Sequence, residues 1–340
     1  MKHEVDLKNF SLHTDLLIDE VENIEEDIIT KENRKINNVE IDVIKVKEDN
    51  LVKRKGTYTT ISFEDITDFK NFNIVEKIFI DELNKIINEQ NLNKDYKVLV
   101  IGLGNRNSTP DSLGVKVCDN ILVTRHIDRL DNLGEDYHSV AAFTPNVMGN
   151  TGLDAQDIIK GILTETKFDL LIIVDALASS KIERVNKTIQ LTDTGIYPGS
   201  GVGNHRKEIS KNTMEIPVIA IGVPTVVDAV TIVSDTINLL IKKIEYLKNN
   251  NPKEKLKAKD KINYLKEERV NISNEEKNHL LGLIGELNDQ ELKSFISEIL
   301  TPIGYNMMVT PKEIDFIIEK LSLLISKGIN KSIHNLKDKI

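Results

Sequence analysis

Several residue types that define common protein classes are scarce in this chain of 340 residues. Trp is absent, and Cys118 is the single cysteine, which excludes an internal disulfide framework and fits a reducing compartment. No stretch reaches the roughly 18 uninterrupted apolar residues of a membrane span, and the acidic first 30 residues lack the apolar segment of a signal peptide. We therefore expect a cytoplasmic protein that does not contact membranes.

Basic residues are outnumbered as well. The formal net charge is -9 and the pI is about 5.4. A chain with no basic excess has little with which to neutralise phosphates, so we expect no direct nucleic-acid binding.

Familiar catalytic and metal-binding signatures are also missing. The sequence contains no His-Glu-x-x-His, no paired Cys-x-x-Cys and no Gly-x-Ser-x-Gly, which removes the signatures of zincins, structural zinc sites and serine hydrolases. Cys118 falls in the apolar stretch 115–123, which favours a buried thiol over a nucleophile. Carboxylate chemistry is what remains.

The centre of the chain predicts an α/β fold. Three short apolar runs, 97–101, 168–174 and 216–221, are typical of buried strands, and helical patterns at 154–166 and 226–247 alternate with them. Strands joined through helices predict a central, mostly parallel sheet with helices on both faces. We place the catalytic core of a single domain at residues 97–250.

The flanks carry different patterns. Residues 1–38 are polar and are treated as an arm, whereas 39–46 and 57–63 predict two neighbouring strands, an N-terminal β insertion, before a helix at 74–91. After the core, 251–272 is a charged connector, and helix-start signals at Ser273, Asn288 and Thr310 predict a C-terminal helical cap over 273–340.

The first buried strand leads into a loop, residues 102–114, that contains Thr109, Pro110 and Asp111. Ligands bind at the carboxyl ends of strands in such sheets. A dinucleotide site fails, because Asn107 stands where Gly-x-Gly-x-x-Gly needs its last glycine. Asp111 lies near the first turn of the following helix, so it is either a functional carboxylate or merely the helix cap.

Asp175 directly follows the five apolar residues 170–174 of the second strand. A carboxylate at the end of a buried strand costs desolvation energy, so we expect its pKa to be shifted. If the first two strands are neighbours, Asp111 and Asp175 face one crevice. Two carboxylates around one water can share a proton, and the ionised one can draw a proton from the water as it attacks a peptide carbonyl.

A third loop, 192–206, is rich in glycine, with Gly199, Gly201 and Gly203. Such a segment lets backbone N–H groups approach an extended peptide or an oxyanion. A P-loop is excluded because Asn204 and His205 follow where Lys and Ser or Thr are required. These glycines, His205 and Asn105 of the first loop are candidate substrate-binding residues, with a surface histidine as the simpler interpretation of His205.

Four segments together resemble the germination proteases of spore-forming bacteria. They are Gly102-Leu-Gly-Asn through Thr-Pro-Asp-Ser-Leu-Gly114, Asp193-Thr-Gly-Ile with Pro198-Gly-Ser-Gly-Val-Gly-Asn204, Ile219-Ala-Ile-Gly-Val-Pro-Thr-Val-Val-Asp-Ala229 and Val309-Thr-Pro-Lys-Glu-Ile-Asp315. They occur in the family's order and span most of the chain.

The resemblance implies an atypical aspartic endopeptidase of the spore core or forespore. It implies that the enzyme degrades small acid-soluble DNA-binding spore proteins and forms a homotetramer, with a fold like that of the hydrogenase-maturation proteases. The family's two essential aspartates fall on Asp111 and Asp175. No cofactor is expected to be required, although in the maturation enzymes the position like Asp111 binds a metal, which leaves a divalent cation open. Tyr197 stands where we expect histidine in many relatives, so no histidine role is carried over.

The resemblance also gives the arm a meaning. Family zymogens lose a short propeptide at an acidic residue followed by an apolar one, a pattern that His13-Thr-Asp-Leu-Leu-Ile-Asp-Glu20 fits. Cleavage is expected between Asp15 and Leu16, giving a propeptide at 1–15 and a peptidase domain at 16–340. Two alternatives stay open, a metal-dependent maturation endopeptidase of similar fold and a non-catalytic peptide-binding protein.

Overall fold

The computed structural model describes residues 15–20, 26–49, 54–128, 133–134, 136–199, 207–249, 274–300 and 307–334. They fall into two compact units. The larger holds the described residues of His13–Val227 and Thr310–Ile340, and the smaller holds those of Asp228–Val309. No helix in these ranges combines the length and the apolar character that crossing a membrane requires.

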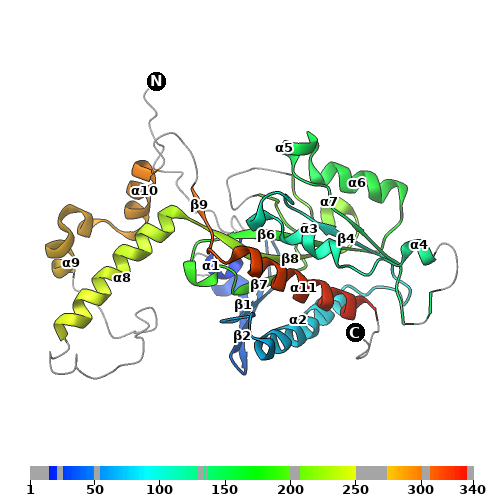
Figure 1. Cartoon of the computed structure of the whole chain (residues 1–340), viewed down its shortest axis with the longest axis horizontal. Coiled ribbons are helices and arrows are strands. Elements are labelled where there is room, and N and C mark those ends of the chain that lie inside the picture. Colours follow the sequence, from blue (N-terminus) through cyan, green and yellow to red (C-terminus); the bar gives the residue numbers. More distant parts are fainter. Residues whose placement is uncertain are drawn as a thin grey trace. The chain divides into compact units, whose positions relative to one another are not determined.

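The larger unit is built on one sheet with the strand order β1-β2-β3-β7-β8-β6-β4-β5 (Figure 1). Its parallel half contains β4 (Val98–Gly102), β5 (Val140–Phe143), β6 (Leu170–Ser179) and β8 (Val218–Asp228). Its antiparallel half contains β1 (Ile29–Ile36), β2 (Val39–Val46), β3 (Gly56–Ser62) and β7 (Thr188–Thr192), which also pairs antiparallel with β8. The predicted α/β fold with a central parallel sheet is confirmed.

The parallel strands are buried on both faces, because successive side chains point to opposite sides. In β6, Leu170, Ile172 and Val174 join one hydrophobic cluster, whereas Leu171 and Ile173 join another. Helices α2 (Phe69–Glu89), α3 (Leu113–Asp119) and α11 (Ile314–Ile333) contribute to the first cluster, and α6 (Ala155–Glu165) and α7 (Lys211–Met214) contribute to the second. Figure 1 shows α2 and α11 side by side, and the two helices are in contact.

The helix starts follow local capping chemistry. Asp154 is the N-cap of α6, and its side chain accepts a hydrogen bond from the backbone N–H of Gln156. Asp68 does the same for α2 through Asn71. The predicted helices at 154–166 and 74–91 are confirmed, although α2 begins five residues before the predicted start. The short elements are α1 (Leu17–Glu20), η2 (Glu26–Ile28), η3 (Thr109–Asp111), α4 (Arg125–Asp128), α5 (Met148–Thr151) and η4 (Ile182–Arg184).

Two other boundaries differ from the sequence prediction. The arm at 1–38 contains strand β1, which turns into β2 through Asn37 at a φ of 54°. The helix expected at 226–247 begins later, as α8 (Ala229–Asn249), because β8 continues through Pro224. Pro224 lies at a register shift opposite Leu177 and beyond the last residue that pairs with β7, so its missing N–H breaks no regular ladder.

The smaller unit contains α8, α9 (Asn274–Leu281), η7 (Gly282–Glu286), α10 (Asp289–Leu300) and β9 (Met308–Val309). Its core joins Val230 of α8 to Leu292 and Ile296 of α10. The helices expected as one cap at 273–340 are thus divided, because the apolar face of α11 packs in the larger unit. The connector expected at 251–272 lies outside the described residues.

Candidate functional site

Three glycines allow the loop after β4 to pack closely on itself and on the middle of β6. A Cβ atom on Gly102 would lie 2.0 Å from the carbonyl oxygen of Gly114, and one on Gly114 would lie 2.3 Å from that of Val174. Gly104 has a φ of 111°, and its Cβ would lie 1.9 Å from the carbonyl oxygen of Asp111. Only glycine allows these approaches, so the sequence of this loop fixes where its backbone runs.

Asp111 is the last residue of η3, directly before α3. Its carbonyl oxygen accepts a hydrogen bond from the N–H of Asn105 at 2.9 Å, and its N–H donates to the carbonyl of Ser108 at 2.9 Å. The N-cap of α3 is Ser112, so Asp111 is not the cap of that helix. The carboxyl group of Asp111 is half-buried.

Asn105 was predicted to bind substrate. In the structure its backbone braces Asp111, and its side-chain oxygen accepts from the N–H of Asn107 at 3.0 Å. These contacts show Asn105 organising the turn that carries Asp111.

Asp175 lies within β6, which continues to Ser179, so the strand does not end where the apolar run ends. It pairs with Gly222 of β8 and is the first residue beyond the β4 ladder, whose last pair is Gly102 with Val174. Asp175 is 6% exposed, and its Oδ1 accepts a hydrogen bond from the N–H of Ala176 at 2.9 Å. Alternation along β6 places its side chain on the same face as Leu171 and Ile173.

The two aspartates belong to the same edge of the sheet. Strands β4 and β6 are parallel neighbours, η3 contacts β6, and the chain leaves β4 through a hydrogen bond from the N–H of Leu103 to the carbonyl of Val174. The structure thus places Asp111 in the loop that follows β4 and Asp175 on the neighbouring β6, at the first position beyond the β4 ladder. A buried and a half-buried carboxyl group so placed suit general acid–base chemistry on a water.

Other candidates contribute less. Burial raises the pKa of Cys118 to about 12, which leaves the thiol protonated and inert at neutral pH. Within the described ranges, no three His, Cys, Asp or Glu side chains gather closely enough to hold a metal ion. Gly199 is half-buried with a φ of 73°, whereas Gly201, Gly203 and His205 lie outside the described residues.

Asp193 was quoted in the family signature without a role, and the structure gives it one. Its Oδ1 accepts a hydrogen bond from the N–H of Thr57 at 2.7 Å, beside Gly56, whose φ is 153°. Burial raises the pKa of Asp193. This carboxyl group ties the start of β3 to the loop after β7.

The expected cleavage site lies beside the end of β6. Asp15 donates its N–H to the carbonyl of Ala178 at 3.1 Å, and its Oδ2 accepts from the N–H of Ala178 at 3.0 Å. Leu16 is fully buried, and Leu17 donates its N–H to the side-chain oxygen of Gln190 at 2.9 Å. The Asp15–Leu16 bond therefore borders β6 three residues after Asp175.

A buried ion pair anchors the residues that follow. Oδ1 of Asp19 lies 2.7 Å from Nε of Arg184, and Oδ2 accepts from the hydroxyl of Ser179 and the N–H of Ser180 at 3.0 and 3.1 Å. The Asp19 side chain is fully buried. Such a carboxylate is costly to bury unless it is paired, so these contacts hold α1 firmly against the end of β6.

Comparison with known proteins assigns the chain to a family. The germination protease family model matches residues 6–339. Germination proteases of Bacillus cereus (strain ATCC 10987 / NRS 248) and Bacillus anthracis (strain CDC 684 / NRRL 3495) are 40% and 41% identical, each match covering 99% of this chain and 98% of the relative. A [NiFe] hydrogenase maturation protease, HycI from Thermococcus kodakarensis KOD1, matches 42% of this chain and 80% of its own at 16% identity, with a TM-score of 0.27. The family model and the two relatives cover almost the whole chain, which belongs to the germination protease family.

Proposed function

We propose that this protein is an aspartic-type endopeptidase of the spore core that begins the degradation of small acid-soluble spore proteins during germination. The observation that carries the catalytic part is the placement of Asp111 in the loop after β4 and of Asp175 on the adjacent strand β6, directly beyond its last pair with β4. Family membership supports the substrate and the setting.

In the proposed mechanism one water lies between the two carboxyl groups. Because two nearby carboxylates ionise unequally, one stays protonated and the other acts as general base. The base takes a proton from the water as the water oxygen attacks the scissile carbonyl carbon. The protonated partner donates a hydrogen bond to the developing oxyanion, and a proton then passes to the leaving nitrogen as the C–N bond breaks.

We further propose that the chain is a zymogen, active as a homotetramer, that removes its first 15 residues by cutting between Asp15 and Leu16. The contacts of Asp15 with Ala178 support a cleavage site on the same edge as Asp175. An acidic residue followed by a buried leucine would then describe both the processing site and the favoured substrate sequence.

The test is intact-mass spectrometry of the purified protein held at mildly acidic pH, together with digestion of a purified small acid-soluble spore protein. We compare wild type with Asp111→Asn, Asp175→Asn and a control, Asp81→Asn, an exposed position on α2. Wild type and the control should lose residues 1–15 and cut the substrate, whereas both site variants should fall by about 10³-fold or more in cleavage rate.

Other outcomes lead elsewhere. Full cleavage by Asp175→Asn would refute the two-aspartate mechanism. Loss of cleavage after treatment with a chelator, restored by a divalent cation, would favour the metal-dependent alternative. A substrate that binds to wild type and stays intact would favour the peptide-binding alternative.

A further inference from the structure

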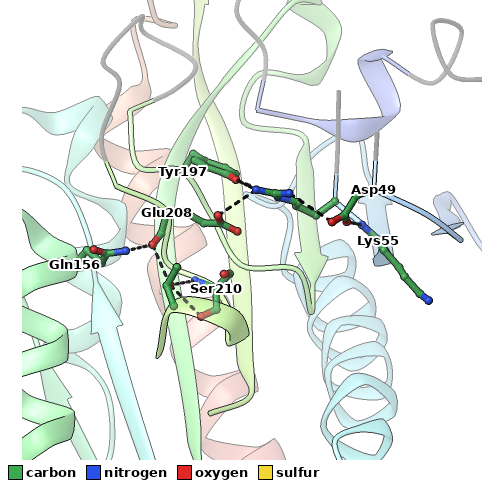
Figure 2. A network of polar contacts seen from close by, with 8 residues as sticks. Asp49, Lys55, Gln156, Tyr197, Glu208 and Ser210 are labelled. Carbon is green, nitrogen blue, oxygen red and sulfur yellow. Dashed lines mark hydrogen bonds and ion pairs between the residues drawn. The ribbon is translucent and has the colours of Figure 1, made fainter. Parts of the chain in front are cut away.

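One arginine joins the two arms of the loop that follows β7. Nε and Nη2 of Arg54 donate hydrogen bonds to the hydroxyl of Tyr197 at 3.1 and 2.9 Å, and Nη2 lies 3.3 Å from Oε2 of Glu208. Figure 2 shows Tyr197 and Glu208 directed toward the same guanidinium group. The two partners adjoin Ile196 and Ile209, which form an isolated antiparallel bridge with two hydrogen bonds of 2.9 Å. The Arg54 guanidinium thus adds a side-chain connection, between Tyr197 and Glu208, next to the backbone bridge of Ile196 and Ile209.

Glu208 is also held from the opposite side. Its backbone carbonyl accepts hydrogen bonds from Nε2 of Gln156, at the start of α6, and from the hydroxyl of Thr213 in α7 at 3.0 Å (Figure 2). Gln156 is 6% exposed, so this amide has little freedom to move. Glu208 therefore links the antiparallel half of the sheet, through Arg54, to the helices beside the parallel half.

Arg54 is itself oriented before it reaches the loop. Asp49 lies 3.4 Å from its Nη1 and accepts a hydrogen bond from the N–H of Lys55 at 2.7 Å (Figure 2). The hydroxyl of Tyr58 donates to the backbone carbonyl of Arg54 at 3.1 Å. These contacts fix the backbone and one edge of the guanidinium, which leaves the other edge for Tyr197 and Glu208.

The base of this loop packs on the face of the sheet that Asp175 occupies. Ile196 and Ile209 belong to the cluster that contains Leu103, from the loop leading to Asp111, and Ile173, two residues before Asp175. By alternation, Asp175 and Ile173 lie on the same side of β6. A displacement of Ile196 or Ile209 would therefore disturb the packing of this cluster, which includes the start of the loop that leads to Asp111 and the β6 residue two positions before Asp175.

We propose that Arg54 is a positioning residue of this enzyme, which holds residues 196–197 and 208–209, the two sides of the isolated bridge, at the spacing that an extended peptide substrate requires. The proposal rests on the proposed peptidase function and adds a residue that touches neither aspartate. A planar guanidinium can serve a hydroxyl and a carboxylate from two arms at once, which a lysine ammonium on a flexible stem does less well. Burial raises the pKa of Tyr197, which keeps its hydroxyl protonated and able to accept from Arg54.

The test measures steady-state cleavage of a purified small acid-soluble spore protein by wild type, Arg54→Gln, Arg54→Lys, Tyr197→Phe and the double variant Arg54→Gln/Tyr197→Phe. A matched control, Arg34→Gln, breaks a comparable ion pair between β1 and Glu82 of α2. We expect Arg54→Gln to raise KM about tenfold and to change kcat less than about twofold, because binding geometry is lost and the aspartates are intact. Arg54→Lys should recover only part of this loss, and the double variant should be no worse than Arg54→Gln, since both changes break one unit.

A second measurement separates this inference from the proposed function. Amide hydrogen exchange at residues 195–199 and 207–210 should be about tenfold faster in Arg54→Gln than in wild type, and unchanged in Arg34→Gln. If wild type cleaves and Arg54→Gln has the wild-type KM, the positioning role is wrong and the peptidase stands. If wild type does not cleave, the proposed function fails. Unchanged exchange in Arg54→Gln overturns the inference in either case.

Discussion

The two halves of the sheet differ in what surrounds their strands. Every residue of β4 is buried, and those of β6 are buried with one exception, because helices cover both faces. In β1, one residue of eight is buried and most of the others are exposed. The parallel half carries the candidate aspartates at its carboxyl edge, and the antiparallel half supplies Arg54 and Thr57, which brace the loop after β7. Rigidity and the candidate catalytic groups thus come from one half, and the support for the loop after β7 comes from the other.

The largest effect is expected where backbone meets backbone in the parallel half. Gly114→Ala places a methyl group 2.3 Å from the carbonyl oxygen of Val174 and 2.5 Å from that of Leu103. Neither atom can move without displacing β6 or the start of the loop after β4, so we expect the free energy of unfolding to fall by more than about 4 kcal/mol. Urea denaturation followed by circular dichroism measures it.

The control for that experiment is Gly161→Ala in α6, where an added Cβ would meet nothing within 4 Å. Alanine favours a helix, so this variant should gain about 0.5–1 kcal/mol. A Gly114→Ala protein as stable as wild type would show that the loop after β4 can relax, and that the glycines do not fix the place of Asp111.

The same contrast explains which strands the sequence predicts. Strands buried on both faces are continuous apolar runs, so β4, β6 and β8 stand out along the chain. Strand β1 reads Ile-Thr-Lys-Glu-Asn-Arg-Lys-Ile, because solvent covers most of it, and it escapes detection. Its stability comes from eight residue pairs with β2, a partner that composition cannot reveal.

A second prediction compares equal substitutions in the two halves. Ile172→Ala removes a fully buried side chain from β6, and we expect it to cost about 3 kcal/mol through lost burial and the cavity left behind. Ile36→Ala removes a side chain that is 44% exposed at the end of β1, and we expect less than about 1 kcal/mol. Thermal unfolding of both variants measures the difference, and equal losses would mean that β1 contributes to a core as strongly as β6 does.

The sequence predicts only part of the candidate site, because apolar runs can be recognised along the chain but contacts between distant residues cannot. Asp111 and Asp175 follow buried apolar runs in the sequence, so their neighbourhood can be inferred from the rule that ligands bind at the carboxyl ends of parallel strands. Arg54 and Tyr197 are separated by 143 residues, and Thr57 and Asp193 by 136. No periodicity joins such pairs, because their meeting depends on the register of β3 against β7.

A smaller effect distinguishes the two halves by the sign of their pH dependence. In the parallel half, Nδ1 of the fully buried His334 accepts a hydrogen bond from the N–H of His138 at 3.2 Å, and burial lowers the pKa of His334 below its ordinary 6.5. A lowered histidine pKa gives stability that is present above pH 6.5 and is lost as the pH falls through the folded value. In the antiparallel half, burial raises the pKa of Asp193 above 3.8, so its contribution is present below that pH and is lost as the pH rises.

Denaturation of wild type, His334→Asn and Asp193→Asn at a series of pH values tests both signs. Asparagine offers His334's acceptor and Asp193's hydrogen-bond oxygen without titrating in this range. The stability advantage of wild type over His334→Asn should shrink as the pH falls below 6.5, whereas its advantage over Asp193→Asn should grow as the pH falls toward 3.8. Parallel curves for wild type and either variant would show that the group concerned has the same proton affinity in the folded and unfolded chains. In that case the difference between the halves would be one of packing alone, because linkage requires a proton affinity that changes on folding.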